Sequence, residues 1–183
     1  MAEIPVGILK FPNGQIVGET EIVVQYKDPK SGANGPKTDK GIDLLSYSFS
    51  GSTAGSGGGV GGFAGGKVQL QLFHFSKKTD MATPKLFEFM CLGKNIDLVH
   101  FVVLRAATQG GDEGSNLDTY YAYAFTNVTI ASFNTGGSPG DDGRSHEDVS
   151  FAFERFDYLF GLQTPSGTQS LKAFYNQKTQ EGG

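Results

Sequence analysis

The chain of 183 residues is 38% hydrophobic and 12% aromatic, which is enough to bury the core of a single globular domain. Its formal charge of −4 argues against the basic surface on which nucleic-acid binding depends. No stretch reaches the roughly 18 apolar residues of a membrane helix, and the opening MAEIPVGILKFPNG resembles no secretory leader. We therefore expect one domain, folded in the cytoplasm and not inserted into a membrane.

Large apolar residues alternate with small or polar ones along much of the chain, which predicts a mainly β protein. The first clear case is IDLLSYSFS at 42–50. Its alternate residues fall on opposite faces of a strand, with Leu45, Tyr47 and Phe49 on one and Ser46, Ser48 and Ser50 on the other. We expect Tyr47 and Phe49 to pack inward.

A glycine-rich run, GSTAGSGGGVGGFAGGKV at 51–68, follows this strand. Its end fits the GxxxxGK part of a nucleotide-binding loop, but Val68 stands where a hydroxyl would reach magnesium, and VQLQLFHF then alternates like a strand. A linker is disfavoured because strand-like sequence lies on both sides. With the polar segments 27–41 and 134–148, the run is predicted to be a loop that orders against another subunit.

One helix is predicted within 79–94, TDMATPKLFEFMCLGK, and it is two to three turns long. Thr83 can cap it, Pro84 suits its first position, and Gly93 can end it. The helical spacing predicts a buried stripe of Leu86, Phe89 and Met90, with Cys91 packed near it.

The remaining segments again predict strands. Residues 95–104 are almost continuously apolar, which indicates burial on both faces. Residues 120–130 set Tyr121, Tyr123 and Phe125 against Ala122, Ala124 and Val128. In 147–160 the aromatic residues change parity, which predicts a β-bulge near Glu154 and Arg155. A last strand at 170–175 precedes a tail, 177–183, that we expect to be frayed.

The motifs that could indicate catalysis or metal binding lack the neighbouring residues that such sites need. Residues 136–140 read GxSxG, but Pro139 follows the serine and has no N–H for an oxyanion hole, so the motif predicts a turn. The histidines are too far apart in sequence to predict a metal site: His74, His100 and His146. Two sets of charges are predicted to be solvated: the acidic pairs Asp112/Glu113, Asp141/Asp142 and Glu147/Asp148, and the lysines Lys67, Lys77, Lys78, Lys85 and Lys94. We therefore predict a binding or assembly protein, not an enzyme, without cofactor or metal.

The order of segments resembles a known family. Its most specific part runs Phe75, Lys77, Asp80, Thr83, Pro84, Leu86, Gly93 and Lys94, within GGKVQLQLFHFSKKTDMATPKLFEFMCLGKNIDLVHFVVLRA. GIDLLSYSFS before it, and SFNTGG and EDVSFAFERFDY after it, are also family-like. From about Gly41 onward the chain resembles the Hcp family, the haemolysin-coregulated tube proteins of bacterial type VI secretion systems. Residues 1–40 diverge, with a longer loop from Lys27 to Lys40.

The resemblance implies a β-barrel or sandwich with one flanking helix and long polar and glycine-rich loops. It also implies six copies closed head to tail into a ring, rings stacked into a tube inside a sheath and capped by a spike, and effector proteins carried in the lumen and secreted without a signal peptide. On this basis we expect Ser46 and Ser48 to line the lumen. The expected assembly loops contain Lys30, Gly32, Lys37, Gly57, Gly61, Gly137 and Asp141.

Two alternatives remain open at this point. One is the inner-tube protein of a phage-tail-like contractile device, which has the same architecture but different partners. The other is a monomeric β-sandwich that binds a small ligand or carbohydrate, for which we expect a monomer in dilute solution and clustered exposed aromatic residues.

Overall fold

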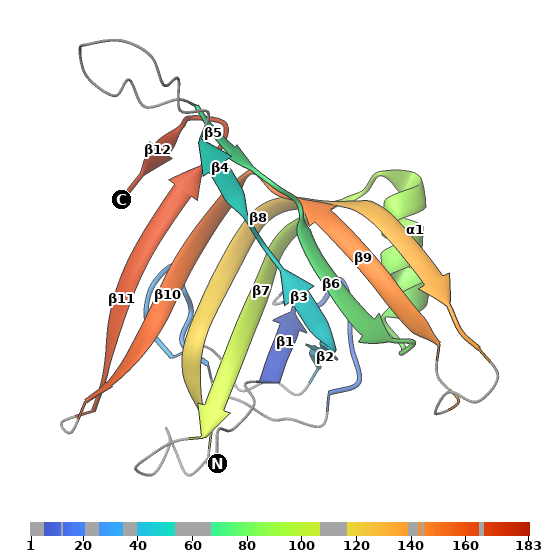
Figure 1. Ribbon diagram of the computed structural model, residues 1–183, viewed down its shortest axis with the longest axis horizontal. Coiled ribbons are helices and arrows are strands. Elements are labelled where there is room, and N and C mark those ends of the chain that lie inside the picture. Colours follow the sequence, from blue (N-terminus) through green and yellow to red (C-terminus); the bar gives the residue numbers. More distant parts are fainter. Residues whose placement is uncertain are drawn as a thin grey trace.

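The computed structural model describes residues 6–11, 13–20, 26–34, 40–53, 67–106, 117–138, 143, 145–164 and 167–183. The elements in chain order are β1 (Val6–Lys10), β2 (Ile42–Asp43), β3 (Ser46–Ser48), β4 (Gly51–Thr53), β5 (Val68–Leu70), β6 (Phe73–Lys78), α1 (Thr83–Leu92), β7 (Asn95–Ala106), β8 (Leu117–Gly136), β9 (His146–Ala152), β10 (Arg155–Thr164), β11 (Gly167–Asn176) and β12 (Glu181–Gly182). The predicted mainly β fold with one short flanking helix is confirmed (Figure 1).

Apart from β4 and β5, which pair as a separate two-stranded sheet, the described strands form one antiparallel sheet of ten strands that divides at β8 into two parts. What we call the long sheet has the order β12-β11-β10-β8-β7-β1-β2, and the short sheet has the order β3-β6-β9-β8. Residues 117–129 of β8 pair with β7, and residues 129–136 pair with β9. Because β8 turns from one sheet into the other, the sheets fold over a common core in a sandwich-like body, and β3 and β4 cross in front of the long sheet (Figure 1).

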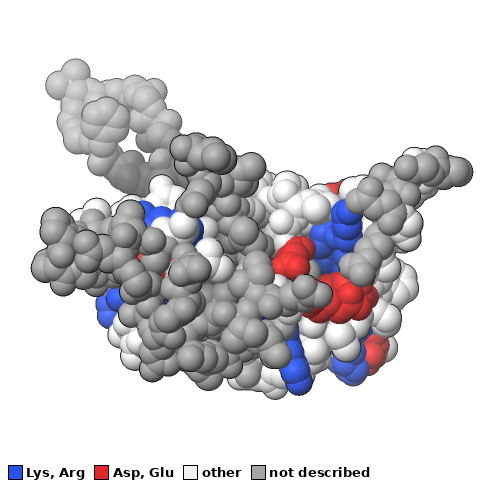
Figure 2. Space-filling model, turned by 90° about the horizontal axis from the view of Figure 1, so that it is seen from below, with Lys and Arg blue, Asp and Glu red and all other residues white. Residues whose placement is uncertain are grey.

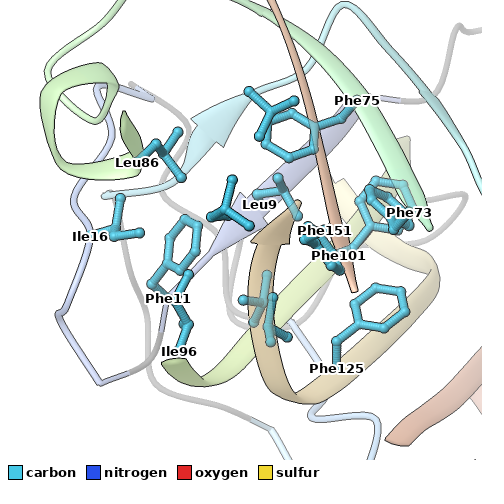
Figure 3. Close-up of a cluster of buried hydrophobic side chains, with 14 of the residues drawn as sticks. Leu9, Phe11, Ile16, Phe73, Phe75, Leu86, Ile96, Phe101, Phe125 and Phe151 are labelled. Atoms are coloured by element: carbon cyan, nitrogen blue, oxygen red, sulfur yellow. The ribbon is translucent and has the colours of Figure 1, made fainter. Parts of the chain in front are cut away.

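Aromatic side chains fill the space between the sheets. Phe73 from β6 and Phe151 from β9 stack with ring centroids 5.0 Å apart, and both contact Phe125 of β8. Figure 3 shows these rings near Phe101, with Leu86 of α1 reaching the same cluster. β7 is buried on both faces from Val99 to Leu104, as its apolar run predicted.

The alternation in β8 is interrupted at Asn127, which has a left-handed backbone (φ 55°). Phe125 and Val128 consequently both face the main core, so the predicted placement of Val128 opposite Phe125 is wrong. Beside β8, strand β9 ends at Ala152 and the next strand, β10, begins at Arg155. The parity change expected near Glu154 is therefore a break between two strands and not a bulge within one.

Helix α1 follows most of its sequence signals. Gly93 ends it in a left-handed conformation (φ 58°), and its N–H donates to the Met90 carbonyl. Leu86 and Phe89 are buried and Met90 packs beside them, as predicted. Two predictions are wrong. The N-cap is Ala82, with no side-chain cap, and Cys91 is exposed.

The N-terminus of α1 is tied to the short sheet by a buried ionic network. The Lys77 ammonium, on a residue with 0% exposure, lies 2.6 Å from Glu147 Oε2 and 2.7 Å from Asp80 Oδ1, and it donates to Thr83 Oγ1 at 2.9 Å. The Thr83 hydroxyl in turn donates to Glu147 at 2.9 Å. Lys77 and Glu147 were predicted to be solvated, and both predictions are wrong because each occupies an inward position of its strand. A charge buried there requires an opposite partner.

The C-terminal residues add an edge strand. Tyr175 pairs with Gly182 and Asn176 with Glu181, so the tail expected to be frayed turns back along β11. Within the described ranges, no helix has the length and apolar character that crossing a membrane would require.

Candidate carrier and assembly surface

The outer face of the short sheet carries small polar side chains from all four strands. A groove of about 430 Å³ on this face is lined by Ser46, Tyr47, Ser48, His74, Phe75, Ser76, Ser132, Asn134, Asp148 and Val149. Strand register places these residues together, since Ser48 lies opposite His74 and Ser76 lies between Ser46 and Asp148. We call this surface the polar face.

The polar face is built for hydrogen bonding rather than for charge. Its one carboxylate, on Asp148, accepts a hydrogen bond from the Ser76 hydroxyl, and the Ser132 and Ser150 hydroxyls are 2.6 Å apart. None of the described residues that line the groove is a lysine or arginine. Such a surface can offer hydroxyl, amide and imidazole groups to a partner, directly or through water.

On the described part of a second face, charges of both signs lie together. Figure 2 shows basic side chains lying beside acidic ones on the described part of one face. On α1, the exposed Glu88 carboxylate is bound by Lys85 at 2.8 Å and by Lys94 at 3.0 Å. These two lysines lower the pKa of Glu88 through their hydrogen bonds. On these described residues, opposite charges lie too close together to form the single-sign field that would draw in a highly charged polymer.

A catalytic reading of the polar face is not supported by its contacts. Serine, histidine and aspartate all line the groove, but Asp148 is bound by Ser76, and the described contacts join neither carboxylate oxygen to His74. A triad needs the carboxylate to orient the imidazole and the imidazole to bind the nucleophile. In the part of the chain that the structure describes, no group of three or more His, Cys, Asp or Glu residues could hold a metal ion.

The predicted lumen residues Ser46 and Ser48 lie on the polar face and are exposed. Tyr47, between them, contacts the core only in part: its ring lies 4.5 Å from that of Phe101 and its hydroxyl is 2.6 Å from that of Tyr121, but the residue is 37% exposed. Leu45, which the alternation groups with Tyr47, is instead 51% exposed at the edge of the sheet.

The sequence reading missed the other members of the polar face. His74 and Ser76 occupy the outward positions of β6, and Asp148 occupies an outward position of β9. Alternation within 73–78 and 146–152 could have identified these positions, but the register that brings them beside Ser46 is not a local property of the sequence.

The predicted assembly residues do not form one site among the described residues. Lys30 and Gly32 belong to a turn in which the Lys30 N–H donates to Asp28 Oδ1 and the Gly32 N–H donates to the Asp28 carbonyl. Gly137 follows the end of β8, close to Ser145. Four others, Lys37, Gly57, Gly61 and Asp141, lie outside the described residues.

A sandwich-like β body with one flanking helix and a polar face that carries a single carboxylate is typical of a structural, partner-binding class of protein. The model of the family described as "Type VI secretion system effector, Hcp" matches residues 25–160, and the chain belongs to this family of type VI secreted tube proteins. The chain is 29% identical to Protein hcp1 of Pseudomonas aeruginosa over 149 residues, covering 81% of this chain and 88% of that protein.

Solved structures share the fold. A type six secretion system protein aligns with a TM-score of 0.77 at 19% identity, covering 98% of this chain and all of the other (100%). Hcp1 from Salmonella typhimurium aligns with a TM-score of 0.66 at 23% identity, covering 98% and 99%. A type VI secretion system effector from Yersinia pestis aligns at 0.63 and 22%, covering 93% and 98%.

Proposed function

We propose that this chain is the repeating subunit of a type VI secretion tube, in which six copies close head to tail into a ring and rings stack within a sheath behind a spike. In this arrangement the polar face lines the lumen and contacts the effector proteins that are carried and exported. The observation that carries the proposal is the construction of the short sheet, which has a polar outer face and, as far as the described residues go, an unpaired strand edge at each end.

The two open edges have compatible directions. Within the described residues β3 pairs only with β6, and β8 beyond Thr129 pairs only with β9. Because every neighbour in β3-β6-β9-β8 is antiparallel, β3 and β8 run antiparallel to each other. The β3 edge of one copy can therefore extend the β8 edge of the next as an ordinary antiparallel pair, and repetition of this one contact produces a ring if the rotation closes.

Apolar side chains flank both edges. Leu45 is 51% exposed beside β3. Near the open part of β8, Phe87 of α1 is 48% exposed and its ring lies 5.4 Å from that of Phe133. Joining the edges would remove apolar surface from water on each side of the new strand pair, at roughly 25 cal/mol per Å².

Sedimentation velocity and negative-stain imaging test the ring, and cysteine cross-linking tests the edges. In a Cys91→Ser background, Ser46→Cys is combined in turn with Ser132→Cys, Asn134→Cys and Gly136→Cys, which lie on the outward face of β8, as Ser46 does on β3, and sample successive registers. We expect an open ring and, in one combination, disulfide-linked oligomers under mild oxidation. Ser46→Cys paired with Lys172→Cys of β11 is the matched control.

The two parts of this proposal fail separately. A monomer at every concentration would overturn the ring. A ring in which none of the three combinations cross-links, while each variant still assembles, would overturn the β3-to-β8 contact and leave the ring in place.

A further inference from the structure

We infer that residues 26–34 form a strap that acid releases from the outer face of the long sheet. This face is the side of β7 opposite the main core. The strap closes on itself through a bridge between Lys27 and Asn34. Within it Asp28 accepts hydrogen bonds from the Lys30 N–H, the Ser31 N–H and the Ser31 hydroxyl.

Three contacts fix the strap to the sheet. The Tyr26 side chain, on a residue 3% exposed, packs in a small second core with Ile8, Val102, Leu104 and Ala122. The Lys27 N–H donates to Thr119 Oγ1 at 3.4 Å, and Lys172 of β11 donates to the Ser31 carbonyl at 3.2 Å. The first of these hydrogen bonds is long and the second is exposed, whereas Tyr26 is buried, so Tyr26 supplies most of the attachment.

Beneath the strap lies a buried histidine. His100 of β7 is 6% exposed, and its Nδ1 is 2.5 Å from the Tyr26 hydroxyl. Burial raises the pKa of Tyr26, so this phenol stays protonated and can donate to Nδ1. The imidazole proton then resides on Nε2, which is buried without a hydrogen-bond partner and lies 3.8 Å from Asp28 Oδ1.

A second proton on His100 would have to enter at Nδ1, the atom that accepts from Tyr26. This second proton would remove the hydrogen-bond acceptor of the Tyr26 hydroxyl and would place a positive charge in a buried site. The charged groups facing the imidazole are Asp28 on the strap, which favours that charge, and the buried Lys10 opposite it on β1, which opposes it. The neighbour on β8, Ala124, is uncharged.

Burial dominates this balance. It lowers the pKa of His100 to about 4, although the Asp28 carboxylate acts in the opposite direction. Burial by itself would raise the pKa of Asp28, but hydrogen bonds from Ser31 and Lys30 and the nearby imidazole lower it below its ordinary value. Asp28 therefore stays ionised at pH 5, and His100 is the group whose protonation changes above that pH when the strap opens.

The closed strap loses stability in acid because the pKa of His100 is higher when the strap is open than when it is closed. With the strap open, His100 is hydrated and takes up a proton near its ordinary value of about 6.5; with the strap closed it does so only near 4. The closed state is fully stable above pH 6.5 and loses stability as the pH falls from 6.5 toward 4. Between pH 7.5 and pH 5 the ratio of open to closed strap rises about thirtyfold.

Hydrogen exchange of the full chain, corrected for the intrinsic pH dependence of exchange, measures this ratio. We expect protection of 26–34 to fall about thirtyfold between pH 7.5 and pH 5, while β8 and β10 keep theirs. His100→Gln can still accept from Tyr26 and donate toward Asp28 but cannot be charged, so its strap should stay protected at pH 5.

An unchanged strap in the wild type, or equal acid sensitivity in His100→Gln, would overturn the proposal. Nitrogen NMR of His100 in the wild type gives a test that does not depend on how the variant folds. Its shifts should show the Nε2–H form at pH 7.5 and no titration above pH 5. An imidazole that titrates near pH 6.5 would also overturn the proposal.

Discussion

The two faces of β6 show how one strand separates stability from recognition. Its inward residues are Phe73, Phe75 and Lys77, which belong to the core and to the ionic network below α1. Its outward residues include His74 and Ser76, which belong to the polar face. Polar groups occur on both faces, but only those on the inward face are deprived of water, so the same residue types have very different energetic weight.

Removal of one member of the buried ion pair is expected to have the largest effect on stability. Glu147→Ala leaves the Lys77 ammonium in a buried site with only Asp80 as an anionic partner, and we expect it to lower the free energy of unfolding by about 3–5 kcal/mol. On the outward face, Asp148→Ala should cost less than about 1 kcal/mol. Urea denaturation followed by circular dichroism measures both changes.

The double variant Lys77→Met/Glu147→Leu separates the ion pair from simple loss of packing. Replacing both charges with apolar groups of similar size should recover most of the stability lost in Glu147→Ala. If Glu147→Ala costs no more than Asp148→Ala, the network does not hold the helix and the sheet together in the way that we describe.

Sequence reasoning located most elements because the signals for them are local. Alternation identified the strands, and Pro84 and Gly93 marked the ends of α1. Prediction from the sequence failed at single residues whose backbone conformation or burial is unusual for their residue type. Asn127 adopts a left-handed backbone that moves Val128 to the core side, and lysine at position 77 usually indicates a solvent-facing side chain.

The candidate site was only partly predictable for a different reason. Ser46 and Ser48 could be assigned to a common outward face from their own strand. Asp148 could not be added to that face, because it reaches it only through the pairing of β6 with β9, about 70 residues apart in sequence. The Tyr26 to His100 contact likewise joins residues 74 apart.

The two sides of α1 should also differ in how much they contribute to stability, with a smaller loss than that expected for Glu147→Ala. Leu86 is fully buried in the main core, so Leu86→Ala should leave a cavity and cost about 2–4 kcal/mol. Cys91 is exposed one turn further along the same helix, and Cys91→Ala should change stability by less than about 0.5 kcal/mol. Thermal and urea unfolding of both variants check the contrast; equal effects would mean that α1 is not anchored by its inner stripe.

The smallest change in stability is expected on the polar face, where the effect on function should be largest. Ser48 is exposed opposite His74, so both Ser48→Arg and the control Ser48→Thr should leave the unfolding free energy within about 0.5 kcal/mol of the wild type. In a ring that carries effectors against this face, Ser48→Arg places a bulky charge in the lumen of every subunit. Retention of a co-expressed effector during purification should then fall with the arginine and persist with the threonine. If both rings assemble and retain the effector equally, the polar face is not the carrier surface; if the arginine variant loses its fold, Ser48 is not the outward residue that β3 shows it to be.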